Sequence, residues 1–146
     1  MTPNRLDIIA AELWWGNKCG HAALAAVLGV PMREARRLMP PAKDHLVTQS
    51  MWKAALDRAE RKWSDIGVEC PSPGAYGLVC LAFSGGPSHA VAIRNDGLKI
   101  TAFDNSSARW LTLRTWESII LPIHKLTTLS RRCWIDSVIE VEAKRE

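Results

Sequence analysis

The feature that most constrains the fold is a change of sequence period near the middle of the chain. Before Gly67 the hydrophobic residues recur at helical spacing, and after it they gather in short runs that are typical of strands. A chain that is helical first and strand-rich second predicts an α+β fold, with a helical N-terminal half and a C-terminal antiparallel sheet. The 146 residues are enough for one domain, 1–146, with a hydrophobic core of its own.

Three segments of the first half are predicted to be helical. Residues 19–28 are rich in Ala, and Gly29 follows them as a common helix stop. A short helix is expected at residues 31–39, because Pro31 suits a first helical turn. A longer helix is expected at residues 49–63, where apolar side chains fall at helical spacing.

The second half is expected to consist of strands joined by tight turns. The strand-like runs are residues 78–83, 89–93, 98–103, 110–113 and 137–141, with a helical turn or more at 115–120. The sequence Asn95-Asp96-Gly97 predicts a hairpin between two of these strands. A two-residue turn centred on Asp96 and Gly97 places residue 89 opposite residue 104.

Composition and charge argue against several classes of partner. The formal net charge is +4, but the basic residues form only short clusters such as Arg33, Arg36 and Arg37, which fit a solvated helix face. We therefore expect no nucleic-acid partner. No apolar run is long enough for a membrane span. The N-terminus lacks the pattern of a signal peptide, so a cytoplasmic location is expected, with delivery as an effector left open.

The cysteines argue against a zinc site of the usual cysteine type. The chain has four of them, Cys19, Cys70, Cys80 and Cys133, and no pair has the CxxC spacing. In a chain without a secretory signal, free thiols are expected rather than disulfides. The sequence therefore predicts no metal and no cofactor.

Two segments carry the residues of a nucleophilic site. Cys19 begins the Ala-rich helix, where the partial positive charge of a helix N-terminus lowers the pKa of a thiol. His89 begins a strand after Gly85-Gly86-Pro87, and an imidazolium beside the sulfur would lower that pKa further. Asp104, opposite His89 in the predicted register, would hold the Nδ1–H of the ring, with Asn105 as the alternative orienter.

The remaining polar residues near these motifs are assigned more weakly. The backbone N–H of Cys19 and the side chain of Asn17 are candidate oxyanion donors, and Glu12 is a weaker one because a carboxylate repels an oxyanion. The other histidines, His21, His45 and His124, have no partner pattern and are expected to be ordinary helix, surface or loop residues. A lone Cys or a lone His is more often structural, so the functional assignment depends on the joint pattern.

Three short segments resemble the papain-like cysteine peptidases, most closely the C39-like branch that is named for bacteriocin-processing peptidases. They are Asn-Lys-Cys-Gly-His-Ala-Ala-Leu at residues 17–24, Ser-His-Ala-Val-Ala-Ile at 88–93, and Phe-Asp-Asn at 103–105. That branch typically has a Cys-Gly-Pro-Ala-Ala-Leu helix start, a Gly-His-x-Val strand and a following Asp-Pro. The similarity covers about residues 12–120. It implies a papain-like fold in which the Cys-bearing helix packs on the antiparallel sheet.

The resemblance also implies roles and a reaction. Cys19 would be the nucleophile, His89 the general base and acid, and Asp104 the orienter of a free-standing bacterial, phage or effector peptidase. It would cleave a peptide or isopeptide bond of a protein or peptide substrate through a thioester. The family's oxyanion Gln before the Cys is absent, and Asn17 stands near its place. An acyltransferase, deamidase or amidase on the same scaffold, and an inactive binding or inhibitor module, are the alternatives.

Overall fold

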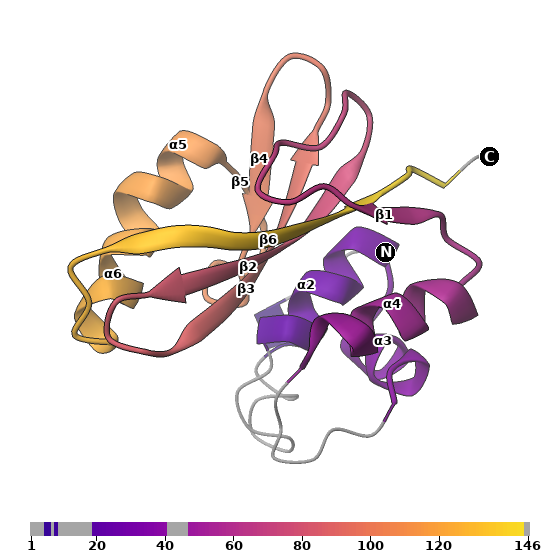
Figure 1. The fold of residues 1–146 in the computed structure, drawn as a ribbon, viewed down its shortest axis with the longest axis horizontal. Coiled ribbons are helices and arrows are strands. Elements are labelled where there is room, and N and C mark those ends of the chain that lie inside the picture. The colour runs from indigo at the N-terminus through magenta and orange to yellow at the C-terminus, as the bar shows by residue number, and fades with distance from the viewer. Residues whose placement is uncertain (1–4, 7, 9–18, 41–46, 145–146) are drawn as a thin grey trace.

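The computed structural model describes residues 5–6, 8, 19–40 and 47–144. Helices come first along the chain, and an antiparallel sheet follows, so the predicted α+β class is confirmed. Figure 1 shows the N-terminal helices on one side of the sheet and a second helical run on the other. The candidate site is assembled from both of these layers and from the sheet between them.

The N-terminal helices form one layer: α2 (Cys19–Leu28), α3 (Met32–Leu38) and α4 (Gln49–Arg58). Residues 20–27 of α2 are all buried. The small Ala side chains allow this helix to lie close to the sheet, where a helix of larger residues would stand further away. Gly29 ends α2 by taking a positive φ of 68°, as its position after the Ala-rich run predicts.

Helix α4 is shorter than its apolar spacing predicts. Thr48 caps it by accepting the N–H of Met51 at 3.2 Å, but the helix ends at Arg58 and Glu60 takes a positive φ of 56°. Trp63, which the spacing assigned to the helix, begins strand β1 (Trp63–Asp65) instead. Trp63 packs against the same core as the helix. An apolar residue at this position therefore continues the helical spacing of α4 although it belongs to a strand.

The sheet has six strands in the order β1-β6-β2-β3-β4-β5, and every neighbouring pair is antiparallel. After β1 the strands are β2 (Tyr76–Phe83), β3 (Ser88–Asn95), β4 (Ile100–Phe103), β5 (Trp110–Thr112) and β6 (Cys133–Val141). The predicted strands are all present, but β2, β3 and β6 are longer than expected and β4 and β5 are shorter. The last strand inserts between the first two, so the C-terminal segment completes the sheet.

The hairpin between β3 and β4 has a longer loop than the sequence signal predicts. Asn95 pairs with Ile100, and Asp96 closes the loop by donating its N–H to the carbonyl of Lys99. The pairing register therefore differs by two residues from the predicted one. A shift of two keeps every side chain on its expected face, whereas a shift of one would reverse the faces.

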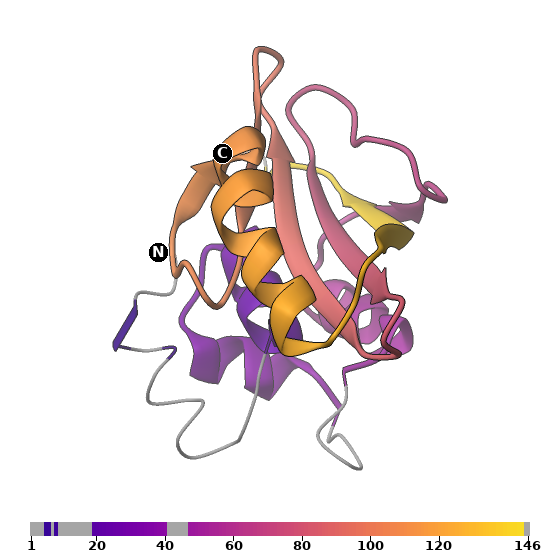
Figure 2. The same ribbon diagram turned by 90° about the vertical axis from the view of Figure 1, so that its left-hand side faces the viewer.

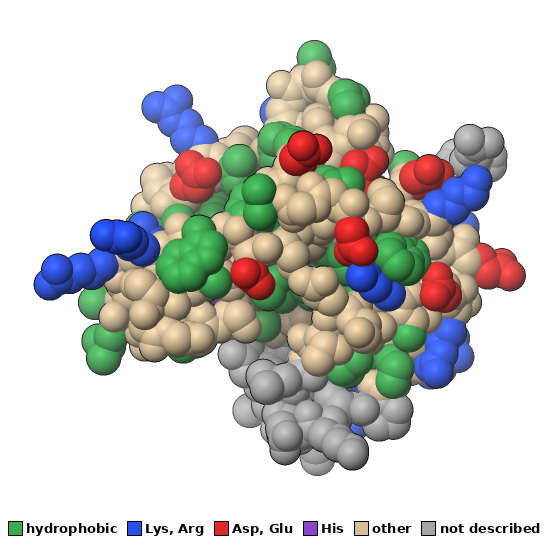
Figure 3. Space-filling view, in the orientation of Figure 1, with side chains coloured by type: hydrophobic (Ala, Val, Ile, Leu, Met, Phe, Trp, Pro, Cys, Tyr) green, Lys and Arg blue, Asp and Glu red, His purple; other side chains and the backbone are tan. Residues whose placement is uncertain are grey.

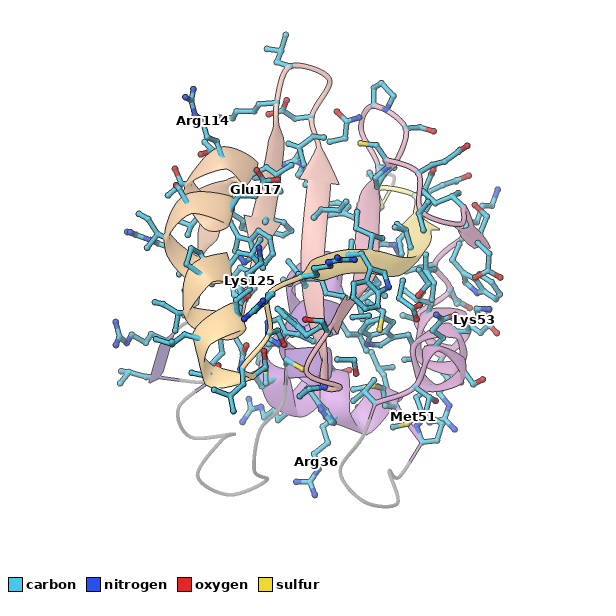
Figure 4. All side chains as sticks on the ribbon, turned by 60° about the vertical axis from the view of Figure 1, so that its left-hand side comes forward. Arg36, Met51, Lys53, Arg114, Glu117 and Lys125 are labelled. Carbon is cyan, nitrogen blue, oxygen red and sulfur yellow. The ribbon has the colours of Figure 1, made fainter. Side chains whose placement is uncertain are left out.

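The two faces of the sheet carry separate hydrophobic cores. Leu78 and Ala92 belong to the core that faces α2, whereas Val79 and Val91 belong to the opposite one. The opposite face packs on a helical run made of α5 (Leu113–Thr115), η2 (Trp116–Ile120) and α6 (Leu121–Thr127). Figure 2 shows this run in front of the sheet, and Figure 4 shows Arg114, Glu117 and Lys125 along it.

The surface has mixed charge on the face shown in Figure 3, where acidic and basic side chains are interspersed. In the part of the chain that the structure describes, no helix combines the length and apolarity that crossing a membrane requires. The four cysteines are free thiols, and Cys70 is the exposed one.

Candidate active site

Cys19 and His89 meet although they are far apart in the sequence. Cys19 is the first residue of α2, and its side chain is hydrogen-bonded to that of His89. The backbone of Ala90, the next residue of β3, is also hydrogen-bonded to the thiol. The packing of α2 on the sheet therefore brings the sulfur to the start of β3.

His89 is held on its other side by Asp104. Its Nε2 lies 2.9 Å from Oδ2 of Asp104, which leaves Nδ1 as the ring nitrogen for the thiol of Cys19. Nδ1 was predicted to be the nitrogen that binds the carboxylate, and this detail is wrong.

The carboxylate reaches His89 along a different path from the predicted one. Strand β4 ends at Phe103, which pairs with Ala92, so residue 104 follows the strand rather than pairing with residue 89. The predicted direct pairing is therefore wrong. The two residues nevertheless share a face of the sheet, and the side chains meet diagonally across it.

Asp104 is the most fully enclosed charged residue of the site, with no exposed surface. Its Oδ2 accepts from Nε1 of Trp116 at 2.9 Å and lies 2.9 Å from Nε2 of both His89 and His124. Its Oδ1 accepts the backbone N–H of Ser106 at 2.9 Å. A buried carboxylate needs such partners to offset its lost hydration.

These contacts shift the protonation of all three residues toward charged forms. Burial by itself raises the pKa of the Cys19 thiol, but the hydrogen bond and charge of His89 outweigh it and lower that pKa. Burial lowers the pKa of His89, yet hydrogen bonds and negative charge from Asp104 and Cys19 raise it to about 10. Hydrogen bonds from His124 and His89 hold the pKa of Asp104 below its usual range, against the effect of burial.

Sequence analysis missed two members of this cluster, Trp116 and His124. His124 was expected on the surface or in a loop, but it lies on α6 with a side chain that is 14% exposed. Its ring centroid is 4.1 Å from that of His89, with the two planes tilted by 42°. The available signal was the spacing of eight residues between Trp116 and His124, which places them near one face of a continued helix.

The other candidate residues have different outcomes. Asn17 and Glu12, the proposed oxyanion residues, and His45 lie outside the described residues. Asn105 lies in the turn after β4 and lines a cavity of about 490 Å³ beside His89 and His124. His21 is a buried residue of α2, in agreement with its expected role as an ordinary helix residue. Among the described residues, one group of side chains is placed so that it could hold a metal ion: His89, Asp104 and His124.

Comparisons with known proteins leave the family open. No protein-family model matches the sequence, and no curated protein matches it. Among solved structures, the crystal structure of the Pseudomonas avirulence protein AvrPphB is similar, with 13% sequence identity and a TM-score of 0.38. The match covers 95% of this chain and 70% of that chain.

Proposed function

We propose that this protein is a cysteine hydrolase of the papain-like type that cleaves a peptide or isopeptide bond in a protein or peptide substrate. Cys19 is the nucleophile, His89 the general base and acid, and Asp104 the orienting carboxylate. The observation that carries the proposal is the continuous series of hydrogen bonds from Cys19 through His89 to Asp104. The proposal includes the C39-like branch, on the three sequence segments that resemble it.

The arrangement suits a thiolate–imidazolium pair in the resting site. The lowered pKa of Cys19 and the raised pKa of His89 both favour a proton on the ring over a proton on the sulfur. Asp104 stabilises the imidazolium and fixes the ring, because its own pKa stays low. The proposed reaction therefore starts from the thiolate and needs no separate deprotonation step.

In the proposed reaction the sulfur of Cys19 bonds to the substrate carbonyl carbon. His89 gives its proton to the leaving nitrogen, the carbon–nitrogen bond breaks, and a thioester forms. Water then gives a proton to His89 while its oxygen attacks the thioester, and the thiolate leaves. The backbone N–H of Cys19 at the start of α2 is the proposed oxyanion donor, together with Asn17.

The enzymatic alternatives share the thioester and differ in the acceptor that resolves it or in the amide that is attacked. Water gives hydrolysis, an amine gives acyl transfer, and a side-chain amide as substrate gives deamidation. Product analysis by mass spectrometry, with and without an added amine, separates these outcomes. An inactive binding module would form no thioester and would keep its function in Cys19→Ser.

The test of the proposal is the rate of thiol alkylation at each cysteine. With iodoacetamide at neutral pH, Cys19 is expected to react at least about tenfold faster than Cys80 or Cys133, because thiolate is the reactive form. Burial raises the pKa of both reference thiols. Peptide mapping by mass spectrometry gives the three rates in one sample.

His89→Ala is expected to remove the advantage of Cys19, because the charge partner of the thiolate is lost. Ser88→Ala is the matched control, since Ser88 is the exposed neighbour of His89 in β3 and should leave the rates unchanged. A Cys19 that reacts as slowly as Cys80 in the wild-type protein, or equally fast in His89→Ala, would overturn the proposal.

A further inference from the structure

Three atoms of the metal-binding type converge beside the proposed nucleophile. Nε2 of His89 and Nε2 of His124 each lie 2.9 Å from Oδ2 of Asp104. The three atoms lie within 4.8 Å of one another. They come from β3, from the turn after β4 and from α6. The convergence is therefore built by tertiary packing and not by one local turn.

The set has the composition of a metal coordination shell, and its two nitrogen–oxygen distances are close to the spacing found in one. Two imidazole nitrogens and one carboxylate oxygen are a common ligand set for zinc and related divalent ions. With metal–ligand bonds of about 2.0–2.1 Å, neighbouring ligand atoms of a tetrahedral ion are about 3.3 Å apart. The nitrogen–oxygen distances of 2.9 Å need to open only slightly to reach that value.

The surroundings hold the ligands in place as an outer shell would. Trp116 donates its Nε1–H to the same carboxylate of Asp104, and the backbone N–H of Ser106 binds the other oxygen. The ring of Phe83 packs edge-on against His124, with centroids 6.3 Å apart. Partners of this kind fix the direction of metal ligands and raise affinity.

The two imidazoles border a cavity that gives an ion access to them and room for a further ligand, whereas Asp104 itself has no exposed surface. His89 and His124 both line the cavity of about 490 Å³, together with Ser88, Asn105 and Ser106. Their side chains are 10% and 14% exposed. A site with three protein ligands and an open side takes a water molecule or an anion in its fourth position.

We propose that His89, Asp104 and His124 bind one divalent transition-metal ion of the zinc class, as an alternative state to the hydrogen-bonded cluster. The ion takes the place of the hydrogen between each Nε2 and the carboxylate. A protonated ring releases that proton to solvent, and a neutral ring moves it to Nδ1, so that each imidazole ligates as a neutral ring through Nε2. Nitrogen ligands favour zinc, cobalt, nickel and copper over magnesium and calcium, which prefer oxygen ligands only.

The consequence for Cys19 rests on the proposed function. In the metal-bound state Nε2 of His89 ligates the ion and no longer donates to Asp104. His89 can then no longer act as the protonated partner of the Cys19 thiolate. The metal state and the proposed reacting state therefore exclude each other, and zinc is expected to inhibit the reaction reversibly. The metal binding itself does not depend on Cys19.

The binding test uses full-length protein with Cys19→Ser and Cys70→Ser, so that neither the active-site thiol nor the exposed thiol can ligate. Equilibrium dialysis with Zn²⁺ and the visible spectrum with Co²⁺ are expected to show one ion per chain, and Mg²⁺ to show none. Adding His124→Gln is expected to weaken binding at least about tenfold. His45→Gln is the matched control for general histidine binding and should leave the affinity unchanged.

Absence of a one-to-one complex, or equal binding in His124→Gln, would overturn the proposed metal site. This outcome is independent of whether Cys19 is the nucleophile. The inhibition is tested by the rate of Cys19 alkylation without Zn²⁺ divided by the rate with Zn²⁺, so that each variant serves as its own reference. This ratio is expected to exceed one in the wild-type protein and to fall toward one in His124→Gln. An unchanged ratio in that variant would assign the inhibition to zinc on the thiol and would contradict the proposal.

Discussion

The two faces of the central sheet differ in what holds them together. The face that packs on α2 is closed, and its strand residues Leu78 and Val141 have no exposed surface. The opposite face is only partly covered, because a cavity of about 350 Å³ lies between the strands and the helical run that contains Trp116. On that face the buried Asp104 and its hydrogen-bond donors provide a polar centre. The comparison indicates that close packing holds one layer, whereas a hydrogen-bond network anchors the other.

The candidate site lies where these two layers meet. Cys19 comes from the closed side, since it begins α2 and packs against the core on that side. His89, Asp104 and His124 contact one another on the open side. The closed layer therefore presents the sulfur, and the layer with spare volume presents the two imidazoles and the carboxylate.

The largest expected difference between the two faces is in how far truncation of a buried side chain lowers the free energy of unfolding. Leu78 and Leu81 lie on the same strand and face opposite cores. Leu78→Ala is expected to lower the free energy of unfolding by about 3–5 kcal/mol, and Leu81→Ala by about 2–3 kcal/mol. Leu81 already lines a cavity, whereas Leu78 is packed on all sides in the closed core. Truncation of Leu81 therefore removes fewer packing contacts than truncation of Leu78. Urea denaturation gives both values, and equal losses would contradict the comparison.

The next effect concerns the polar centre. Trp116→Phe removes one donor from the buried carboxylate of Asp104. In a double-mutant cycle with Asp104→Asn, the two changes are expected to couple by about 1–3 kcal/mol in unfolding free energy.

Trp110→Phe provides the control for this cycle, because Trp110 packs against the closed core. Its effect should add to that of Asp104→Asn within about 0.5 kcal/mol. Additivity in the Trp116 cycle would show that the hydrogen bond contributes nothing specific, and the proposed difference between the layers would fail.

The smallest expected effect comes from filling the cavity of the open face with a larger side chain. Val138 lines the cavity, whereas Val141, three residues later in β6, faces the closed core. Val138→Ile is expected to raise the free energy of unfolding by up to about 1 kcal/mol. Val141→Ile is expected to lower it by about 1–3 kcal/mol, because no space is available for the extra methylene. Thermal or urea unfolding measures both, and the same sign for the two variants would contradict the account.

The parts of the site that sequence reasoning predicts are those with a local signal. Cys19 follows from a helix start, and His89 from a strand start after a glycine-rich loop. Asp104 was predicted from a hairpin register that is wrong by two residues, but the face was right because side chains alternate along a strand. The α+β class followed from the change of period, which needs no long-range information.

The parts that were missed depend on packing between layers. His124 reaches Asp104 only because the helix after β5 continues to Thr127 and lies on the open face. The sequence analysis carried that helix only to residue 120. Likewise, Trp63 was assigned to α4 because a strand residue that packs on a core can mimic helical spacing. Neither contact has a signature within a short window of sequence.

The central claim is that Cys19 is a thiolate at neutral pH because protonated His89 stands beside it. The far-ultraviolet absorbance of the thiolate, taken as wild type minus Cys19→Ser, measures this ionisation between about pH 5 and about pH 10. Because the pKa of Cys19 is lowered, its thiolate signal should persist as the pH falls below the ordinary value of 9.0, and it should vanish only on further acidification. A signal that first appears as the pH rises toward 9.0 would contradict the account.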